Sequence, residues 1–141
     1  MHKRHKYDIV VILAVVALAI SLYLSVAESL NLAVPCDLTG GCEDVLNSRY
    51  SRVFGLPLAN WGVVYFGAIV ILALLSNHYR KWRKVLTGSL GLGALASLIF
   101  MGLQFFVIRA VCQYCLATDL LTVAIFLWDL NIEHHNPDLK I

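Results

Sequence analysis

Four long apolar stretches constrain what this chain can fold into. Each comes close to the roughly 20 residues that an α-helix needs to cross a bilayer. Charged residues make up only 14% of the chain, whereas soluble domains carry about 25%. We therefore expect an all-α integral membrane protein, a four-transmembrane-helix bundle that forms a single domain over residues 1–141. The expected spans cover about residues 9–27, 58–76, 86–108 and 112–130.

The first stretch has a second interpretation, because Ser25-Val26-Ala27 resembles the cleavage site of a signal peptide. We interpret it as a retained helix, since the apolar run before it is longer than a usual signal-peptide core.

Basic residues gather in two segments, and their positions predict the topology. The residues are Lys3, Arg4 and Lys6 before the first span, and Arg80, Lys81, Arg83 and Lys84 between the second and third spans. The positive-inside rule places both segments in the cytoplasm. Both termini are then cytoplasmic, and all four cysteines lie on the extracytoplasmic side of the membrane. The net charge of +2 indicates no particular partner, and we expect no nucleic acid.

A Cys-x-x-Cys motif, Cys112 to Cys115, stands at the junction between the third and fourth spans. If Cys112 opens a helix, the spacing places both sulfurs on one face, and the helix N-terminus lowers a thiol pKa. Arg109, three residues upstream, would act in the same direction. Such a thiolate suits thiol–disulfide exchange. For this pair taken alone, two buried, inert cysteines are the alternative.

A second cysteine pair, Cys36 and Cys42, lies in the long loop 28–57. Gly40 and Gly41 between them permit a tight reversal that brings the two sulfurs within disulfide distance. Two dithiols on the same side of a membrane predict a relay, in which the loop pair exchanges with the motif pair. The electrons then need a two-electron acceptor, for which a membrane quinone is the obvious candidate.

The rest of the loop, from Glu43 to Phe54, has a helical pattern, and we expect a short surface helix that caps the bundle. Gly55-Leu56-Pro57 would end this helix and turn the chain back into the membrane.

Three polar residues inside the spans are candidate contacts of the quinone, and each has a structural alternative. Asn60 is either a hydrogen-bond donor to the quinone or a partner in an interhelical hydrogen bond. Tyr65 is either a contact of the quinone or an interfacial aromatic residue, as Trp61 is. Asp119 is a functional candidate because an acidic group inside a span is costly; it would tune a thiol, carry a proton or pair with Arg109, or simply lie in a water-filled pocket.

These motifs together resemble the bacterial homologues of the vitamin K epoxide reductase family. The resemblance rests on Cys36-x5-Cys42, Ser48-Arg49-Tyr50-Ser51, Phe54-Gly55-Leu56-Pro57, Gly62, Tyr65 and Cys112-Gln113-Tyr114-Cys115. It implies a four-helix bundle around a quinone, either ubiquinone or menaquinone, with a vitamin K type as a further option. It also implies a membrane thiol–quinone oxidoreductase that reoxidises a DsbA/thioredoxin-like partner and supports disulfide bond formation.

The resemblance further implies a role for each site residue. Cys36 would exchange with the partner, Cys42 would attack Cys112, and Cys115 would pass electrons to the quinone. Ser48 matches a serine that family members place near the redox site. Many bacterial members carry a fused thioredoxin-like domain; this chain ends soon after the fourth span, so we expect a separate extracytoplasmic partner.

Three other interpretations remain at this point. In DsbB-type proteins the two cysteine pairs come in the reverse order along the chain. The order found here therefore favours the vitamin K epoxide reductase family over the DsbB type. A vitamin K epoxide or quinone reductase would use the same cysteines, although vertebrate members have a tyrosine where this chain has Asp119. A zinc-binding or structural membrane protein would use the four sulfurs as ligands, but we expect no metal because Cys112 and Cys115 border an apolar span. His134 and His135 alone are a weak metal signal.

Overall fold

The computed structural model describes residues 5–32, 35–36, 40, 49 and 52–135, so Cys42 and Ser48 lie outside the described residues. Its long helices are α1 (His5–Ser29), α3 (Leu58–His78), α4 (Lys81–Gly102), which continues into the π-helical segment η2 (Leu103–Ile108), and α5 (Gln113–His135). Across the described ranges, four helical segments are long and apolar enough to span a membrane. The predicted all-α four-helix architecture is therefore confirmed.

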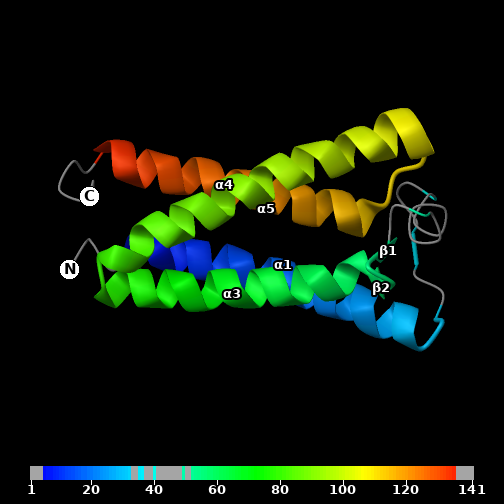
Figure 1. Cartoon of the computed structure of the whole chain (residues 1–141), viewed down its shortest axis with the longest axis horizontal. Coiled ribbons are helices and arrows are strands. Elements are labelled where there is room, and N and C mark those ends of the chain that lie inside the picture. The colour runs from blue at the N-terminus through cyan, green and yellow to red at the C-terminus, as the bar shows by residue number, and fades with distance from the viewer. Residues whose placement is uncertain (1–4, 33–34, 37–39, 41–48, 50–51, 136–141) are drawn as a thin grey trace.

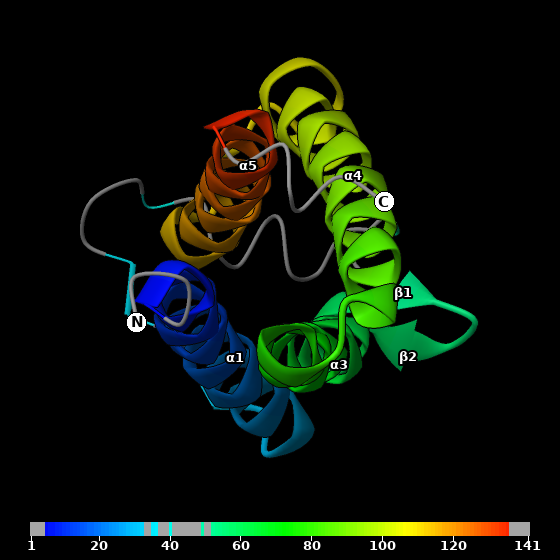
Figure 2. The same cartoon turned by 90° about the vertical axis from the view of Figure 1, so that its left-hand side faces the viewer.

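The four helices form a ring in which each packs against two neighbours (Figure 2). Helix α1 contacts α3 and α5, and α4 contacts the same two helices from the opposite side. Figure 1 shows that α1 begins and α5 ends at one end of the bundle, which we call the terminal end. The end where α1 ends and where α3 and α5 begin is called the loop end. The hairpin lies there, and so do Cys112 and Cys115 at the start of α5.

The helices are apolar on their outer faces as well as inside the bundle. Ile12, Val64 and Leu92 are 61%, 68% and 72% exposed, although a soluble protein would bury such residues. Lipid tails are as apolar as these side chains, so association depends on close packing rather than on the hydrophobic effect. Small residues on the inner face of α1, such as Ala14 and Ala17, are fully buried and permit that close packing.

A two-stranded hairpin replaces the last part of the expected surface helix. Strands β1 (Arg52–Val53) and β2 (Leu56–Pro57) pair in antiparallel fashion, and the turn between them has positive φ at Phe54 and Gly55. The expectation of helix up to Phe54 was wrong at this end, because these two left-handed residues close a tight hairpin turn. The indole N–H of Trp61 donates to the Val53 carbonyl at 3.1 Å and attaches the hairpin to α3.

The terminal half of the bundle is filled by an apolar core, with polar contacts at its edge. Ile69, Leu90 and Ile125 are at the centre of this core. At the edge, the Thr87 hydroxyl donates to the buried carboxylate of Asp129 at 2.6 Å.

Tyr65 lies where this core meets the loop half of the bundle, and its position depends on a glycine of α4. Its hydroxyl donates to the Ser89 carbonyl at 2.9 Å. A Cβ atom at Gly93 would lie 1.9 Å from the tyrosine oxygen and 2.5 Å from its Cζ. Tyr65 therefore reaches α4 only because residue 93 has no side chain, and it is packed inside the bundle rather than at the bilayer interface.

We predict that Gly93→Ala destabilises the protein by about 1–3 kcal/mol, the usual cost of overpacking a core. The added methyl group must displace the Tyr65 ring and break its hydrogen bond to Ser89. Gly88→Ala on the same helix is the matched control, because nothing lies within 4 Å of a Cβ atom there. Thermal unfolding in detergent compares the two variants, and equal melting temperatures would contradict this packing account.

Candidate redox site and cavity

Cys112 stands at the start of α5 and caps it. The Leu116 N–H donates to the Cys112 carbonyl at 2.8 Å, and the Cys115 N–H donates to the Cys112 sulfur at 3.3 Å. The sulfur thus occupies the position of an N-cap oxygen, satisfying an amide that the helix itself leaves without a partner. Cys112 is completely buried. The expectation that Cys112 opens a helix is confirmed.

This environment favours the thiolate of Cys112. The side-chain hydrogen bond with Cys115 is the largest effect, and together with the backbone N–H groups of Cys115 and Tyr114 it lowers the pKa of Cys112 from 9.0 to about 7. Burial and the negative charge of Glu28 act in the opposite direction. The expected contribution of Arg109 is not among these causes; its side chain is exposed.

The chain reaches this cap through an unusual backbone. Segment η2 is π-helical, and Arg109 follows it with a φ of 58°, which is a left-handed conformation. Single π-helical turns within helices often occur at functional sites. The Oε1 atom of Gln104, from η2, accepts the Cys112 N–H at 2.9 Å. Nothing in the apolar stretch around Gln104 identified this residue in advance, apart from its being a glutamine inside a span.

The loop cysteine that the structure describes lies against the motif. Cys36 is disulfide-bonded and packs against Cys112. The Tyr114 hydroxyl donates to the Pro35 carbonyl at 2.7 Å, so the motif and the loop are also joined by a hydrogen bond. Cys112 and Cys115 are free thiols. Cys112 also packs against Cys115, so it contacts both the loop cysteine and the other cysteine of the motif.

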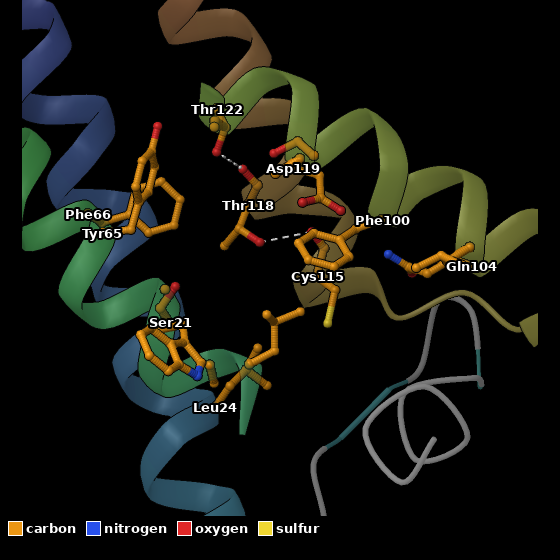
Figure 3. A pocket seen from close by; sticks show the side chains of 18 of the residues that line it. Ser21, Leu24, Tyr65, Phe66, Phe100, Gln104, Cys115, Thr118, Asp119 and Thr122 are labelled. Carbon is orange, nitrogen blue, oxygen red and sulfur yellow. Dashed lines mark hydrogen bonds between the residues drawn. The ribbon is translucent and has the colours of Figure 1, made fainter. Parts of the chain in front are cut away.

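A cavity of about 220 Å³ opens inside the loop half of the bundle (Figure 3). All four helices contribute to its wall, which is largely apolar; Leu24, Phe66 and Phe100 are typical members. Cys115 lines the cavity and Cys112 does not. Tyr65 and Gly93 lie at the end of the cavity nearest the terminal half, and Gln104 and Ile108 lie near the motif. The cavity therefore places one sulfur of the motif beside a largely apolar space inside the bundle.

A few polar groups interrupt the apolar wall on the side of α5. Thr118 donates to the Cys115 carbonyl at 2.8 Å, and Thr122 donates to the Thr118 carbonyl at 2.7 Å, so both hydroxyls bond to their own helix (Figure 3). Asp119 is buried and hydrogen-bonded to Ser97. Glu28 lines the cavity from α1, and its Oε2 atom has no hydrogen-bond partner among the described residues. No motif in the sequence singles out Glu28.

Four residues were expected to contact the cofactor: Ser48, Asn60, Tyr65 and Asp119. The structure places two of them in the cavity wall and one elsewhere. Tyr65 and Asp119 line the cavity, as a contact with a bound ring requires. Asn60 instead accepts a hydrogen bond from the Ser25 hydroxyl between α3 and α1, which is the alternative that the sequence analysis left open. Ser48 and the loop cysteine Cys42 lie outside the described residues. Within the described ranges, no three His, Cys, Asp or Glu side chains gather closely enough to hold a metal ion.

We predict that the first thiol titration of the reduced motif has its midpoint near pH 7. The thiolate is present above this pH and is lost as the pH falls below it. In Cys115→Ala the midpoint should move up towards 9.0, because the largest stabilising hydrogen bond is removed. The ultraviolet absorbance of the thiolate measures both midpoints. An unchanged midpoint in the variant would show that Cys115 does not stabilise the anion.

Comparison with known families adds one finding to this geometry. The family model described as "Vitamin K epoxide reductase family" matches residues 9–130, which is most of the 141 residues. The matched range includes both cysteine pairs, the parts of all four helices between Ile9 and Leu130, and every residue that lines the cavity.

Proposed function

Because the chain belongs to the vitamin K epoxide reductase family, it is a membrane oxidoreductase that links thiols to quinones, and we propose that it reoxidises a separate DsbA/thioredoxin-like protein. In this proposal, electrons enter at the loop pair Cys36/Cys42, pass to Cys112/Cys115 and leave to a ubiquinone or menaquinone. The reoxidised partner then introduces disulfide bonds into secreted proteins.

The position of Cys112 is the observation that carries this proposal. Cys112 packs against both Cys36 and Cys115, while Cys115 alone of the two motif cysteines lines the cavity. Thiol–disulfide exchange requires contact between sulfurs, so this order matches the order of a relay. The further assignment, that Cys42 attacks Cys112 while Cys36 meets the partner, rests on the resemblance to the family.

The cavity fits a quinone ring in its chemistry. A quinone is a flat apolar ring with two carbonyl groups, and ligand sites of this kind combine an apolar wall with a few placed polar groups. Phe66 and Phe100 offer flat faces, while Gln104 and Asp119 supply polar atoms beside Cys115. When bound, the quinone accepts two electrons and two protons and leaves as the quinol.

The balance of protons assigns a role to Asp119. Oxidation of Cys112 and Cys115 forms one S–S bond and releases two electrons. If Cys112 is already a thiolate, only Cys115 still carries a thiol proton, so the quinol needs a second proton from elsewhere. We assign the delivery of that proton to Asp119, which lies one helical turn beyond Cys115 on the cavity wall.

The charge pattern supports an orientation in the membrane. Arg80, Lys81, Arg83 and Lys84 all lie at the terminal end, where α3 ends and α4 begins. The positive-inside rule places this end in the cytoplasm. The loop end, with the cysteines, then faces the extracytoplasmic side of a bacterial inner membrane, where disulfides form and persist.

Quinone reduction by purified protein in detergent tests the relay. We expect turnover with a reduced DsbA-like partner, and its loss in both Cys36→Ser and Cys115→Ser. With dithiothreitol as the reductant, Cys36→Ser should retain turnover, because this small thiol reduces the motif directly, whereas Cys115→Ser should remain inactive. Activity of Cys115→Ser with either reductant would exclude the proposed order. Vitamin K epoxide as the oxidant tests the alternative substrate in the same assay.

A second experiment tests the role of Asp119 separately from that of the cysteines. We expect Asp119→Asn to lower quinone turnover by roughly a hundredfold, the typical contribution of a positioned acid or base. Reduction of the Cys112–Cys115 disulfide by the partner, followed without quinone by thiol trapping, should be unchanged. Asp129→Asn is the matched control on the same helix, because Asp129 lies outside the cavity. Equal turnover in the two variants would remove Asp119 from the mechanism.

A further inference from the structure

Gln104 is a residue of the cavity wall whose side chain forms a hydrogen bond with the backbone of Cys112. It is only 3% exposed and lies on the same face of the α4–η2 segment as Gly93, Ser97 and Phe100. Its Oε1 atom accepts the N–H of Cys112 at 2.9 Å, which joins the wall of the cavity to the cap of α5.

This hydrogen bond fixes the orientation of the Gln104 amide. A backbone N–H can be accepted only by the carbonyl oxygen of the side chain, so the NH2 group must project in the other direction. Figure 3 shows the nitrogen of Gln104 on the side where Phe100 and Cys115 lie. An NH2 group donates hydrogen bonds and does not accept them, which suits the carbonyl oxygen of a quinone.

Apart from Glu28, whose Oε2 atom has no hydrogen-bond partner among the described residues, several polar side chains of the wall are engaged within the protein. The hydroxyls of Tyr65, Thr118 and Thr122 each donate to a backbone carbonyl. Asp119 is engaged with Ser97. For Gln104, by contrast, the hydrogen bond of the structure uses only the carbonyl oxygen.

We propose that Gln104 is a positioning residue with two ends: its carbonyl oxygen holds Cys112 in the capping position, and its NH2 group binds a carbonyl oxygen of the quinone. The inference rests on the proposed function and extends it. Through one rigid amide, the ring is held in register with the sulfur pair that reduces it. The π-helical turn and the left-handed Arg109 bring the chain back so that Cys112 meets Gln104 eight residues earlier.

Gln104→Met tests both ends, since methionine has a similar length and shape but cannot make either hydrogen bond. We expect the KM for quinone to rise roughly three- to tenfold, the value of one or two lost hydrogen bonds. The midpoint of the first thiol titration should move up from about 7, because the cap that holds Cys112 is loosened. Val107→Met is the control: it introduces the same side chain in the same segment, at an exposed residue outside the cavity wall.

Quinone binding can also be measured without turnover. In a Cys115→Ser background, a ubiquinone analogue should quench the fluorescence of Trp61, which lines the cavity, and Gln104→Met should weaken this binding by a similar factor. A variant that merely folds less well would lower the active fraction and the melting temperature, but would leave KM and the midpoint unchanged; that result overturns the inference. A parent protein that neither binds nor reduces quinones overturns the proposed function and the donor role together, while the thiol midpoint still tests the hold on Cys112.

Discussion

The cap of α5 is the interaction on which the rest of the site depends. A helix leaves its first amide groups without partners, and here the sulfur of Cys112 accepts one of them. The same contact that starts the helix also stabilises negative charge on the sulfur. It orients Cys115 towards the cavity and leaves Cys112 against Cys36. Structure and reactivity thus share one set of hydrogen bonds.

The membrane setting explains how the bundle tolerates an open cavity next to these hydrogen bonds. In water, an apolar cavity of this kind in a small domain would lower stability substantially. In a bilayer the helices are held by close packing of small residues and by a few interhelical hydrogen bonds. The tightly packed terminal half, with Ile69, Leu90 and Ile125, supplies that stability. The loop half can then remain hollow between the same helices.

Two glycines illustrate how small residues serve the cavity as well as the packing. A Cβ atom at Gly62 would lie 2.9 Å from the hydroxyl oxygen of Ser21, so α1 and α3 approach closely beside the cavity. Because Gly93 has no side chain, Tyr65 fits beside it and forms the end of the cavity that faces the apolar core. Ser89, Gly93 and Ser97 recur every fourth residue along α4. In the structure they contact an aromatic side chain, Tyr65, and a carboxyl group, Asp119.

The sequence by itself determined the four apolar helices, the meeting of the cysteine motif with a helix start, and the interest of Asp119, because length, apolarity and charge inside a span are local properties. It could not determine which face of each helix points inward, since lipid and core are equally apolar and no amphipathic pattern marks the difference. For that reason Asn60 and Tyr65 could not be separated, although one joins α1 to α3 and the other lines the cavity. The hairpin at Arg52–Pro57 and the hydrogen bond from the Cys112 N–H to Gln104 were also decided only by tertiary structure. Both depend on left-handed backbone conformations at Phe54 and Arg109. Phenylalanine and arginine rarely adopt this conformation, so the sequence does not indicate it.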